Sequence, residues 1–438
     1  MKSIQYIIIA FACAAFCACS SDDESPVSDR SPFVMAASPG RGQPNDVIRI
    51  QGKNFSRVRE NNEVMFNDKP GIVIEASSHE LQVVVPSGEG DATVRVRVSG
   101  HEAEGAVPTF TYLEFTDYVV ATVAGSATFG LQDGTGPDAL FRNPEGVAVA
   151  PNGDIIVTDR ANSSIRRVTP DGVVTTILGD GTTGFANGDV SVAKLALPWK
   201  SCVDKYGNIF IADRDNHAIR KIDVNGLVST VAGTGVAGYV DGPGAEAKFS
   251  QPIDVAVDAN GVLYVADNSN HKIRKITPEG VVSTLAGGAA GFIDGDVATA
   301  LFRNPSGVAV DGAGNVYVAD RLNHRIRKID ITSGQVSTIA GAGTAGSRDG
   351  LVGEAQFNGP YGVDVDVDGS VIVADLGNNK IRMIVDGTVT TVAGSSTGFL
   401  DGAGVISKLA SPTDVAVFDG VIYVADLGNH RIRKVYKK

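Results

Sequence analysis

The stretch that decides the fold is Y-V-A-D-N-S-N-H-K-I-R-K-I, residues 264–276. Its first part, a short apolar run that ends in Asp, recurs six times between residue 118 and the C-terminus. The repeated aspartates are Asp159, Asp213, Asp267, Asp320, Asp375 and Asp426, and successive ones lie 54, 54, 53, 55 and 51 residues apart. A period near 50 residues is typical of solenoids and β-propellers, in which each repeat is one supersecondary unit.

Each unit predicts four short antiparallel strands. In the unit that contains Asp267, the expected strands cover residues 255–258, 263–266, 273–276 and 281–285. Glycine turns separate the first strand from the second and the third from the fourth, as tight hairpins require. Four antiparallel strands joined in this way make one propeller blade, so six units predict a six-bladed propeller over residues 118–438.

The two ends of the repeat region predict how the ring closes. Residues 119–125, V-V-A-T-V-A-G, copy the outermost strand of later units, such as V-S-T-V-A-G at 228–233. The last unit stops near Val435 and lacks that strand. We therefore expect the early segment to complete the final blade, which closes the ring and removes an open sheet edge.

The repeated string Y-V-A-D-x-x-N-H-x-I-R-K-I and the linking pattern A-G…D-G…A-x-F…P resemble NHL repeats over all six units. The resemblance implies an NHL-type propeller with six blades around one channel.

A second kind of β domain is expected before the propeller, at residues 31–115. Its short alternating runs are separated by turn clusters such as residues 39–42 and 67–71, which is typical of an antiparallel sandwich. The strings S-P-G at 38–40, I-R-I-Q-G-K-N-F at 48–55, V-P at 85–86 and F-T-Y at 110–112 resemble the immunoglobulin-like IPT/TIG domain. The expected fold class is all-β: an immunoglobulin-like sandwich followed by a six-bladed β-propeller with strand latch closure.

The N-terminal segment predicts export and lipid attachment. Residues 4–18 are uncharged, mostly apolar and too short to span a bilayer comfortably, as in a signal peptide. Residues 16–19, F-C-A-C, resemble a bacterial lipobox and predict a signal peptide at residues 1–18 and lipidation of Cys19. Residues 19–30 form an acidic tether, and an acidic run after a lipidated cysteine resembles the export signal of surface lipoproteins in Bacteroidetes. We expect a surface-exposed outer-membrane lipoprotein; a tether that faces the periplasm is the alternative.

The charge and the cysteines narrow the choice of partners. The chain has 38 basic and 50 acidic residues and a net charge of −12, so it is a poor ligand for phosphate backbones. We expect no nucleic-acid binding and no membrane contact beyond the lipid anchor. Of the four cysteines, Cys13 and Cys17 leave with the signal peptide and Cys19 is lipidated, so Cys202 remains and no intramolecular disulfide is expected.

Residues that repeat in every blade are expected to be structural. Each repeated aspartate precedes an arginine by seven residues: Arg166, Arg220, Arg274, Arg327, Arg382 and Arg433. Six equivalent copies cannot face one substrate, so these pairs are expected to fix each turn against its neighbour. The histidines of one shared turn, His217, His271, His324 and His430, are replaced by Ser163 and Asn379 in the other blades. They cannot converge on one metal ion and are expected to form turn hydrogen bonds.

One acidic stretch imitates a calcium-binding loop. Residues 364–369, D-V-D-V-D-G, match the start of an EF-hand loop, but their register is that of an innermost strand and its hairpin turn. A structural turn is therefore favoured. Asp364 still stands where the other blades carry small residues (Ala148, Cys202, Ala256, Ala309 and Ala416), which keeps it as an ion-site hypothesis. We expect no other metal site and no cofactor.

Function is expected where the blades differ. The position after each unit's Pro reads Glu145, Trp199, Ile253, Ser306, Tyr361 and Thr413, and the next reads Gly146, Lys200, Asp254, Gly307, Gly362 and Asp414. The shared turn adds three arginines on the same face. We predict a ligand site at the channel mouth made of Trp199, Lys200, Tyr361, Glu145, Asp254, Arg160, Arg214 and Arg321. Aromatic planes with polar neighbours suit sugar rings; the alternative is that Trp199 and Tyr361 only fill the channel.

These patterns favour a non-enzymatic binding module, because no catalytic group is assembled. A surface glycan captured for nutrient uptake is the first hypothesis, and it rests on the resemblance to surface lipoproteins of Bacteroidetes. The second is a metal-assisted hydrolase or lactonase of the six-bladed propeller type, which would use Asp254, Asp364 and Asp414. The third is a protein-docking scaffold.

Overall fold

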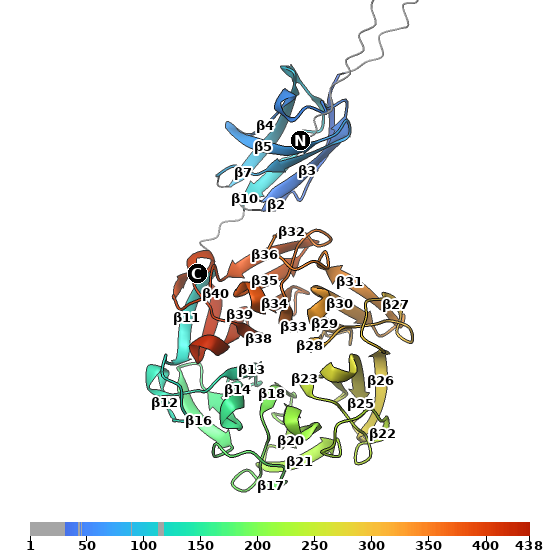
Figure 1. The fold of residues 1–438 in the computed structure, drawn as a ribbon. Helices are drawn as coiled ribbons and strands as arrows, with labels where there is room; N and C mark the ends of the chain where they lie inside the picture. The colour runs from blue at the N-terminus through green and yellow to red at the C-terminus, as the bar shows by residue number, and fades with distance from the viewer. Residues whose placement is uncertain (1–30, 43, 45, 89, 113–117) are drawn as a thin grey trace, which may run out of the picture.

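The computed structural model describes residues 31–438 except 43, 45, 89 and 113–117. The predicted signal peptide, the predicted lipidation site Cys19 and the acidic tether lie outside the described residues. Within the described residues the chain forms two all-β domains, a sandwich and a ring of six blades (Figure 1). No helix in this part of the chain is long and apolar enough to cross a bilayer.

The first domain is the predicted sandwich. Its strands are β1 (Phe33–Ser38), β2 (Arg41–Gly42), β3 (Val47–Lys53), β4 (Asn62–Phe66), β5 (Lys69–Ala76), β6 (Glu80–Val84), β7 (Asp91–Val98), β8 (His101–Glu102), β9 (Glu104–Gly105) and β10 (Thr109–Tyr112), with one 3-10 turn, η1 (Arg59–Asn61). Their hydrogen-bonded order is β2-β10-β7-β4-β5-β6-β3-β1-β9, and β8 pairs with β7. Alternating side chains such as Ile48 and Ile50 of β3 enter a single core with Phe66 and Phe110.

The propeller has six five-stranded sheets among the described residues. From the channel outward, blade 1 has β13 (Pro144–Val149), β14 (Ile155–Asp159), β15 (Ser164–Val168), β16 (Val173–Leu178) and β12 (Gly134–Thr135). Blade 2 has β18 (Pro198–Val203), β19 (Ile209–Asp213), β20 (Ala218–Ile222), β21 (Leu227–Ala232) and β17 (Gly188–Asp189); blade 3 has β23 (Pro252–Val257), β24 (Leu263–Asp267), β25 (Lys272–Ile276), β26 (Val281–Gly287) and β22 (Gly242–Pro243).

In the same order, blade 4 has β28 (Pro305–Val310), β29 (Val316–Asp320), β30 (Arg325–Asp330), β31 (Gln335–Ala340) and β27 (Gly295–Asp296). Blade 5 has β33 (Pro360–Val365), β34 (Val371–Asp375), β35 (Lys380–Val385), β36 (Thr388–Ala393) and β32 (Gly350–Leu351); blade 6 has β38 (Pro412–Phe418), β39 (Val421–Asp426), β40 (Arg431–Lys437), β11 (Tyr118–Gly125) and β37 (Gly402–Ala403). The four predicted strands per blade are present. The fifth is a two-residue pairing of the long loop with the outermost strand, too short to leave a periodic signal in the sequence.

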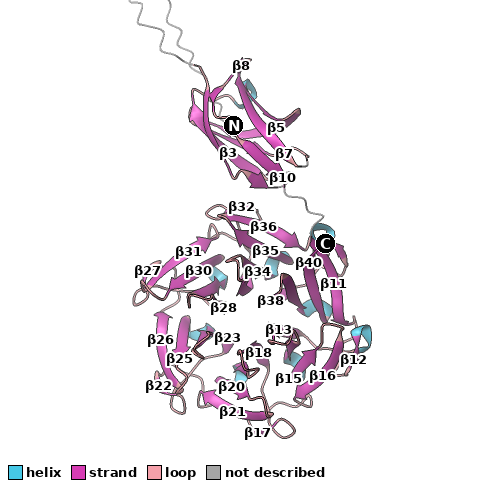
Figure 2. Ribbon diagram, turned by 180° about the vertical axis from the view of Figure 1, so that it is seen from behind, coloured by secondary structure: helices cyan, strands magenta, loops and turns pink. Residues whose placement is uncertain are grey.

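The ring closes by the predicted latch. Strand β11 pairs antiparallel with β40, so that Val120 lies opposite Val435, and it takes the outer position of blade 6. Figure 2, seen from behind, shows β11 beside β40 with β13 of blade 1 nearby. The N- and C-terminal parts of the propeller therefore share one sheet, and the ring has no unpaired outer strand at its junction.

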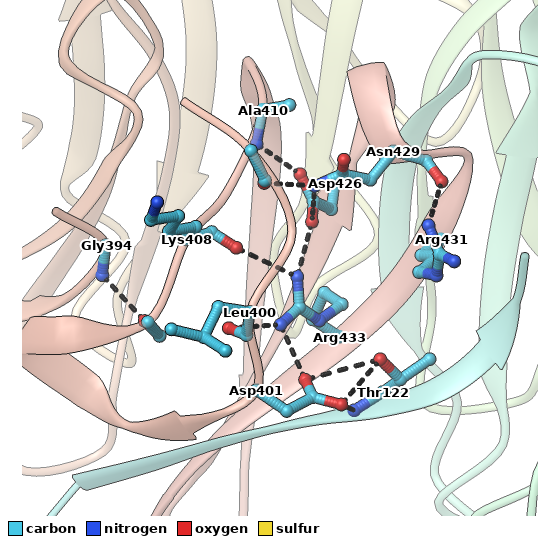
Figure 3. Close-up of polar contacts among 12 residues, drawn as sticks. Thr122, Gly394, Leu400, Asp401, Lys408, Ala410, Asp426, Asn429, Arg431 and Arg433 are labelled. Atoms are coloured by element: carbon cyan, nitrogen blue, oxygen red, sulfur yellow. Dashed lines mark hydrogen bonds and ion pairs between the residues drawn. The ribbon is translucent and has the colours of Figure 1, made fainter. Parts of the chain in front are cut away.

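The repeated aspartate and arginine form buried ion pairs in every blade, as the sequence predicts. The six Asp–Arg contacts measure 2.6 to 3.1 Å, and the paired side chains are fully buried. Figure 3 shows the pair of blade 6, in which Asp426 also accepts hydrogen bonds from Ala410 N and Asn429 Nδ2. Arg433 reaches Asp401, which accepts hydrogen bonds from Thr122 of β11. The pair thus fastens the long loop, the turn and the latch strand together.

The shared histidine turn links neighbouring blades. Each repeated aspartate is followed by a 3-10 turn: η4 (Arg160–Asn162), η5 (Arg214–Asn216), η6 (Asn268–Asn270), η7 (Arg321–Asn323), η8 (Leu376–Asn378) and η10 (Leu427–Asn429); the long loops add η3 (Gly136–Asp138) and η9 (Gly404–Ile406). Nδ1 of His271 accepts a hydrogen bond from Asn304 N in the next blade at 3.1 Å, and the other three histidines do the same. Ser163 and Asn379 accept the equivalent bond, so the predicted role in turn hydrogen bonding is confirmed.

The two domains meet at blade 5. Arg41 pairs with Asp386 at 2.6 Å, and Arg49 pairs with Glu354 at 2.8 Å. Asp386 is mostly exposed and the other three side chains are partly exposed. Exposed ion pairs contribute little free energy, so these two pairs stabilise the domain contact only weakly.

Candidate functional site: the mouth of the propeller channel

The six innermost strands line the channel, and each begins at the same end of the ring. A proline starts every one of them, after a residue with positive φ such as Asn143 or Leu197. Backbone bonds, for example from Ala161 N in η4 to Arg142 O, hold the shared turns against these loops. The strand starts and the turns therefore share one face, as predicted, and this face surrounds the channel mouth.

Lys200 blocks the centre of the channel. Its side chain is fully buried, and Nζ lies 3.0 Å from Asp414 Oδ1 and 3.5 Å from Asp254 Oδ2. The same ammonium donates to the carbonyl oxygens of Ser306 and Tyr361 at 3.3 Å each. Glycine occupies this strand position in the other three blades, and a Cβ at Gly362 would lie 2.6 Å from Asp414 Oδ1. A Cβ at Gly146 would lie 2.8 Å from Lys200 Cα, so the lysine and its aspartates both need small residues beside them.

An aromatic pair spans the channel above Lys200. Trp199 Nε1 donates a hydrogen bond to the hydroxyl of Tyr361, with a nitrogen to oxygen distance of 2.6 Å. The two residues come from blades 2 and 5, so the bond connects opposite sides of the ring. Tyr361 is only 4% exposed, whereas Trp199 keeps part of its surface open. Both the indole N–H and the phenol oxygen already have a partner.

Three arginines cover these aromatic rings. The guanidinium carbons of Arg214 and Arg160 lie 4.4 and 4.6 Å from the Trp199 ring centroid, and that of Arg321 lies 5.0 Å from the Tyr361 centroid. Such distances are in the range of cation–π contacts. The side chains of Arg160 and Arg214 are each 24% exposed. The mouth therefore presents guanidinium groups on an aromatic base.

Carboxylates hold two of the arginines in place. Arg160 Nε lies 3.2 Å from Glu145 Oε2, and Arg214 Nη1 lies 2.6 Å from Asp215 Oδ1. Burial raises the pKa of Glu145 to about 7, although Arg160 and Lys200 oppose that rise. Because a guanidinium has five N–H donors, each arginine keeps donors that these carboxylates do not use.

Burial also shapes the charges around Lys200. It raises the pKa of Asp254 to about 7, against the attraction of Lys200. Burial disfavours the charged form of Lys200, yet Asp414 and Asp254 leave its pKa above the usual value. Lys200 therefore stays protonated, and a change of pH alters the protonation of the neighbouring carboxyl groups instead.

The channel opens into a chamber of about 190 Å³ on the side of Lys200 away from the mouth. Asp254 and Asp414 lie at its roof, and its wall includes Cys202 and Asp364. Asp364 accepts hydrogen bonds from Val365 N and from Val417 N of the next blade, which satisfies an inner strand edge. Burial raises the pKa of Asp364 to about 7 and that of the Cys202 thiol well above its usual value.

The structure thus brings the eight predicted residues together but sorts them into two layers. Glu145, Lys200, Asp254 and Tyr361 are at most 5% exposed and form the buried layer. Trp199, Arg160, Arg214 and Arg321 form the accessible layer, which is the part that a ligand can touch. Among the described residues, no group of three or more His, Cys, Asp or Glu side chains is arranged to hold a metal ion. Asp254 and Asp414 do converge, but on the ammonium of Lys200.

The central position of Lys200 is not evident from the repeat pattern alone. The signal in the sequence is that one strand position holds a lysine in one blade, aspartate in two blades and glycine in the other three. Opposite charges at equivalent positions of a closed ring can meet across its axis. The carbonyl oxygens of Ser306 and Tyr361 leave no such signal, because every residue has one.

Comparisons with known proteins agree with this architecture. The family model of the IPT/TIG domain matches residues 32–112, and that of the NHL repeat matches residues 141–168, 249–276, 302–329 and 409–435. The chain therefore contains an IPT/TIG domain followed by an NHL-repeat propeller.

The sequence relatives match only part of the chain, whereas the similar solved structures cover nearly all of it. The chain is 31% identical over 286 residues to the protein SUPPRESSOR OF QUENCHING 1 of Arabidopsis thaliana; the match covers 60% of this chain and 27% of the relative. A Bacteroides thetaiotaomicron protein of unknown function has a TM-score of 0.58 at 21% identity, covering 94% of this chain and 99% of that one. An auxiliary nutrient binding protein of the same species has a TM-score of 0.57 at 16% identity, covering 93% and 98%. At these identities the structures show the fold alone.

Proposed function

We propose that this protein is a non-enzymatic binding protein of the bacterial cell envelope that captures an acidic polysaccharide at the channel mouth. The observation that carries the proposal is the accessible layer, in which Arg160 and Arg214 lie over Trp199 and Arg321 lies over Tyr361. A planar guanidinium binds carboxylate and sulfate oxygens through paired N–H groups, and aromatic rings suit the C–H faces of sugars.

The support beneath this layer favours binding over hydrolysis. Lys200 compensates Asp254 and Asp414, two of the three carboxylates that a metal-assisted hydrolase would use. The Trp199–Tyr361 bond and the Glu145–Arg160 pair hold the accessible residues in one arrangement, and a preorganised surface loses less entropy when a ligand binds. The fold neighbours include a Bacteroides auxiliary nutrient binding protein, which agrees with capture of a nutrient.

A lipid on Cys19 and the acidic residues after it would hold the protein at the outer membrane, facing outward. Metabolic labelling with a fatty acid tests the anchor, with a Cys19→Ser variant as the control. Proteinase added to intact cells tests the orientation. Equal labelling of both chains would contradict the anchor, and full protection from the proteinase would contradict the outward orientation.

The ligand proposal is tested by titrating purified full-length protein with polygalacturonate and chondroitin sulfate. Arg214→Gln should weaken binding about tenfold, because it removes one charge-assisted contact, and the wild-type affinity should fall as salt is raised. Arg95→Gln is the matched control, since Arg95 is an exposed arginine of the first domain. Equal affinity of wild type and Arg214→Gln, or no binding to either acidic polymer, would contradict the proposal.

Trp199→Ala separates ligand binding from filling of the channel. If Trp199 is part of the binding surface, the variant should lose affinity while its circular dichroism spectrum stays that of the wild type. A variant that loses thermal stability but keeps full affinity would assign Trp199 to the channel packing alone.

A further inference from the structure

The propeller has a second depression that the channel mouth does not explain. It lies between blades 1 and 2 at the opposite ends of the strands, where the hairpin turns are, and its volume is about 560 Å³. A neighbouring hollow of about 310 Å³ shares Ile177 and Val190 with it, so the two hollows lie next to each other along the furrow between the blades. Binding pockets for small ligands fall in the range of about 300–1,000 Å³. We call this furrow the blade 1–2 groove.

One aromatic residue stands at the rim of this groove. Tyr206 is 71% exposed and occupies the tip of the hairpin between β18 and β19. The equivalent hairpin position holds Asn152, Asn260, Ala313 or Asp368 in four other blades, and the turn of blade 6 is shorter. A large exposed ring where the repeat uses small or polar residues is a departure of the same kind as Trp199.

The hairpin holds Tyr206 firmly. Asp204 Oδ1 accepts hydrogen bonds from Tyr206 N and Asn208 N, both at 2.9 Å. Lys205 Nζ donates to Ala259 O at 2.9 Å, which ties the turn to blade 3. The ring therefore projects from a preorganised backbone, and little entropy is lost at this turn when a ligand stacks on the ring.

The walls and the floor of the groove differ in polarity. The floor includes the buried side chains of Ile156, Ile209 and Ile222. The polar lining includes two acidic and two basic side chains, Asp154, Asp223, Arg167 and Lys205. Arg167 is about half exposed and lies 3.9 Å from Asp154, whose Oδ2 also accepts a hydrogen bond from Asn152 Nδ2 at 2.9 Å. Arg167 keeps N–H donors that this long contact does not use. Because acidic and basic groups balance, this groove has no preference for a charged ligand.

We propose that the blade 1–2 groove is a second glycan site, which takes a neutral sugar ring on Tyr206 and hydrogen-bonds its hydroxyls through Asp154, Asp223 and Arg167. An aromatic platform beside mixed donors and acceptors is the chemistry that sugar rings need. The inference extends the proposed glycan binding to another face and another charge class. The first domain contacts blade 5, so it leaves blades 1 and 2 uncovered (Figure 2).

The test uses full-length protein, neutral polymers (mannan, arabinoxylan and a mixed-linkage β-glucan) and the acidic polymers above. Tyr206→Asn installs the residue that blades 1 and 3 carry at this turn, so the fold should be retained. We expect the variant to bind one neutral polymer about tenfold more weakly and the acidic polymers unchanged. Val367→Asn, at a fully exposed apolar residue of the blade 5 hairpin, is the matched control and should bind every polymer as the wild type does.

The neutral and acidic arms report on the two sites separately. Neutral binding that depends on Tyr206 but not on Arg214 supports the groove even if no acidic polymer binds. Acidic binding without any neutral binding overturns the groove and leaves the mouth proposal intact. Neutral binding that Tyr206→Asn does not change, or a peptide ligand that depends on Tyr206 in the absence of sugar binding, also overturns it.

Discussion

Buried ion pairs occur in two regions of the propeller, and they differ in symmetry. Around the ring, six Asp–Arg pairs occupy equivalent places, and each one serves its own blade. On the channel axis, one lysine meets the aspartates of two other blades, and the remaining blades have glycine at that position. The outer pairs belong to the repeat, whereas the central group exists only once the ring has closed.

This difference indicates where to look for function. A residue that every repeat needs for folding recurs in all six blades whether or not the protein binds a ligand, so its recurrence does not indicate a binding site. The central group breaks the repeat, fills the channel and supports Trp199 and the arginines above it. Variants in the two regions should therefore differ in size of effect and in dependence on pH.

The largest effect is expected from Asp267→Ala in the outer ring. Asp267 accepts hydrogen bonds from Ser250 N, Asn270 Nδ2 and Arg274 Nη1, and its removal takes the buried carboxylate away from all three. Asn270 Nδ2 and Arg274 Nη1 keep backbone carbonyl acceptors, but Arg274 loses its buried counter-charge. The free energy of unfolding should fall by about 3–5 kcal/mol, because an arginine cannot neutralise itself by losing a proton. Guanidinium denaturation measures the change. A loss below about 1 kcal/mol would show that the outer pairs are dispensable.

A smaller and pH-dependent effect is expected from Lys200→Met. Without the ammonium, Asp254 and Asp414 have no cation beside them, so their pKa values should rise further above those of the unfolded chain. The folded state then binds more protons than the unfolded state, so the free energy of unfolding falls as pH rises through this window. We expect a loss of about 3 kcal/mol at pH 8 and about half of that at pH 5.

Denaturation of Lys200→Met at the two pH values checks this prediction. The double variant Lys200→Met with Asp414→Asn is the control, because it removes one of the two uncompensated carboxyls and should recover part of the loss at pH 8. An equal loss at pH 5 and pH 8 would contradict the assigned role of Lys200.

The smallest effect is expected at the histidine turn. His271→Ala removes the acceptor of the Asn304 N–H and should cost about 1 kcal/mol, whereas His271→Asn should cost less, because Asn379 accepts the same bond in blade 5. Burial and nearby cations lower the pKa of His271. The unfolded chain therefore takes up the proton first, and the histidine's contribution declines as pH falls below about 6.5.

Thermal denaturation of the wild type and His271→Asn at pH 7.5 and pH 5 measures this contribution. The difference between the two chains should move in favour of the asparagine variant on acidification. A difference that is independent of pH would mean that the His271 Nδ1 contact is not the relevant one.

The sequence predicts much of the fold because equivalent positions of the six repeats can be compared with one another. Six copies of one apolar run ending in Asp indicate six blades, and a displaced copy at residues 119–125 indicates the latch. The same comparison found the eight residues of the mouth. It left open whether Tyr361 binds a ligand or fills the channel, and it did not predict that Glu145 would be buried, since burial depends on which side chains the opposite blades place in the channel.

Tyr206 is a residue whose difference from the other blades can be seen in the sequence, although its surroundings cannot. Its departure from Asn152, Asn260, Ala313 and Asp368 is visible in the sequence, but one exposed aromatic residue in a hairpin turn does not by itself indicate a binding site. The groove beside it was not predictable in the same way, because its volume depends on how blades 1 and 2 pack together.

The amino-acid sequence by itself determined the number of blades, the pairing of each Asp with the Arg seven residues later, and the closing strand. These are local or periodic features, set by strand alternation, turn residues and a fixed repeat length. Only the tertiary structure decided that Lys200 would meet Asp254 and Asp414, and that Trp199 would bond to Tyr361 across the channel. Those contacts join residues of different blades, and their distances are fixed by the closed ring rather than by any spacing along the chain.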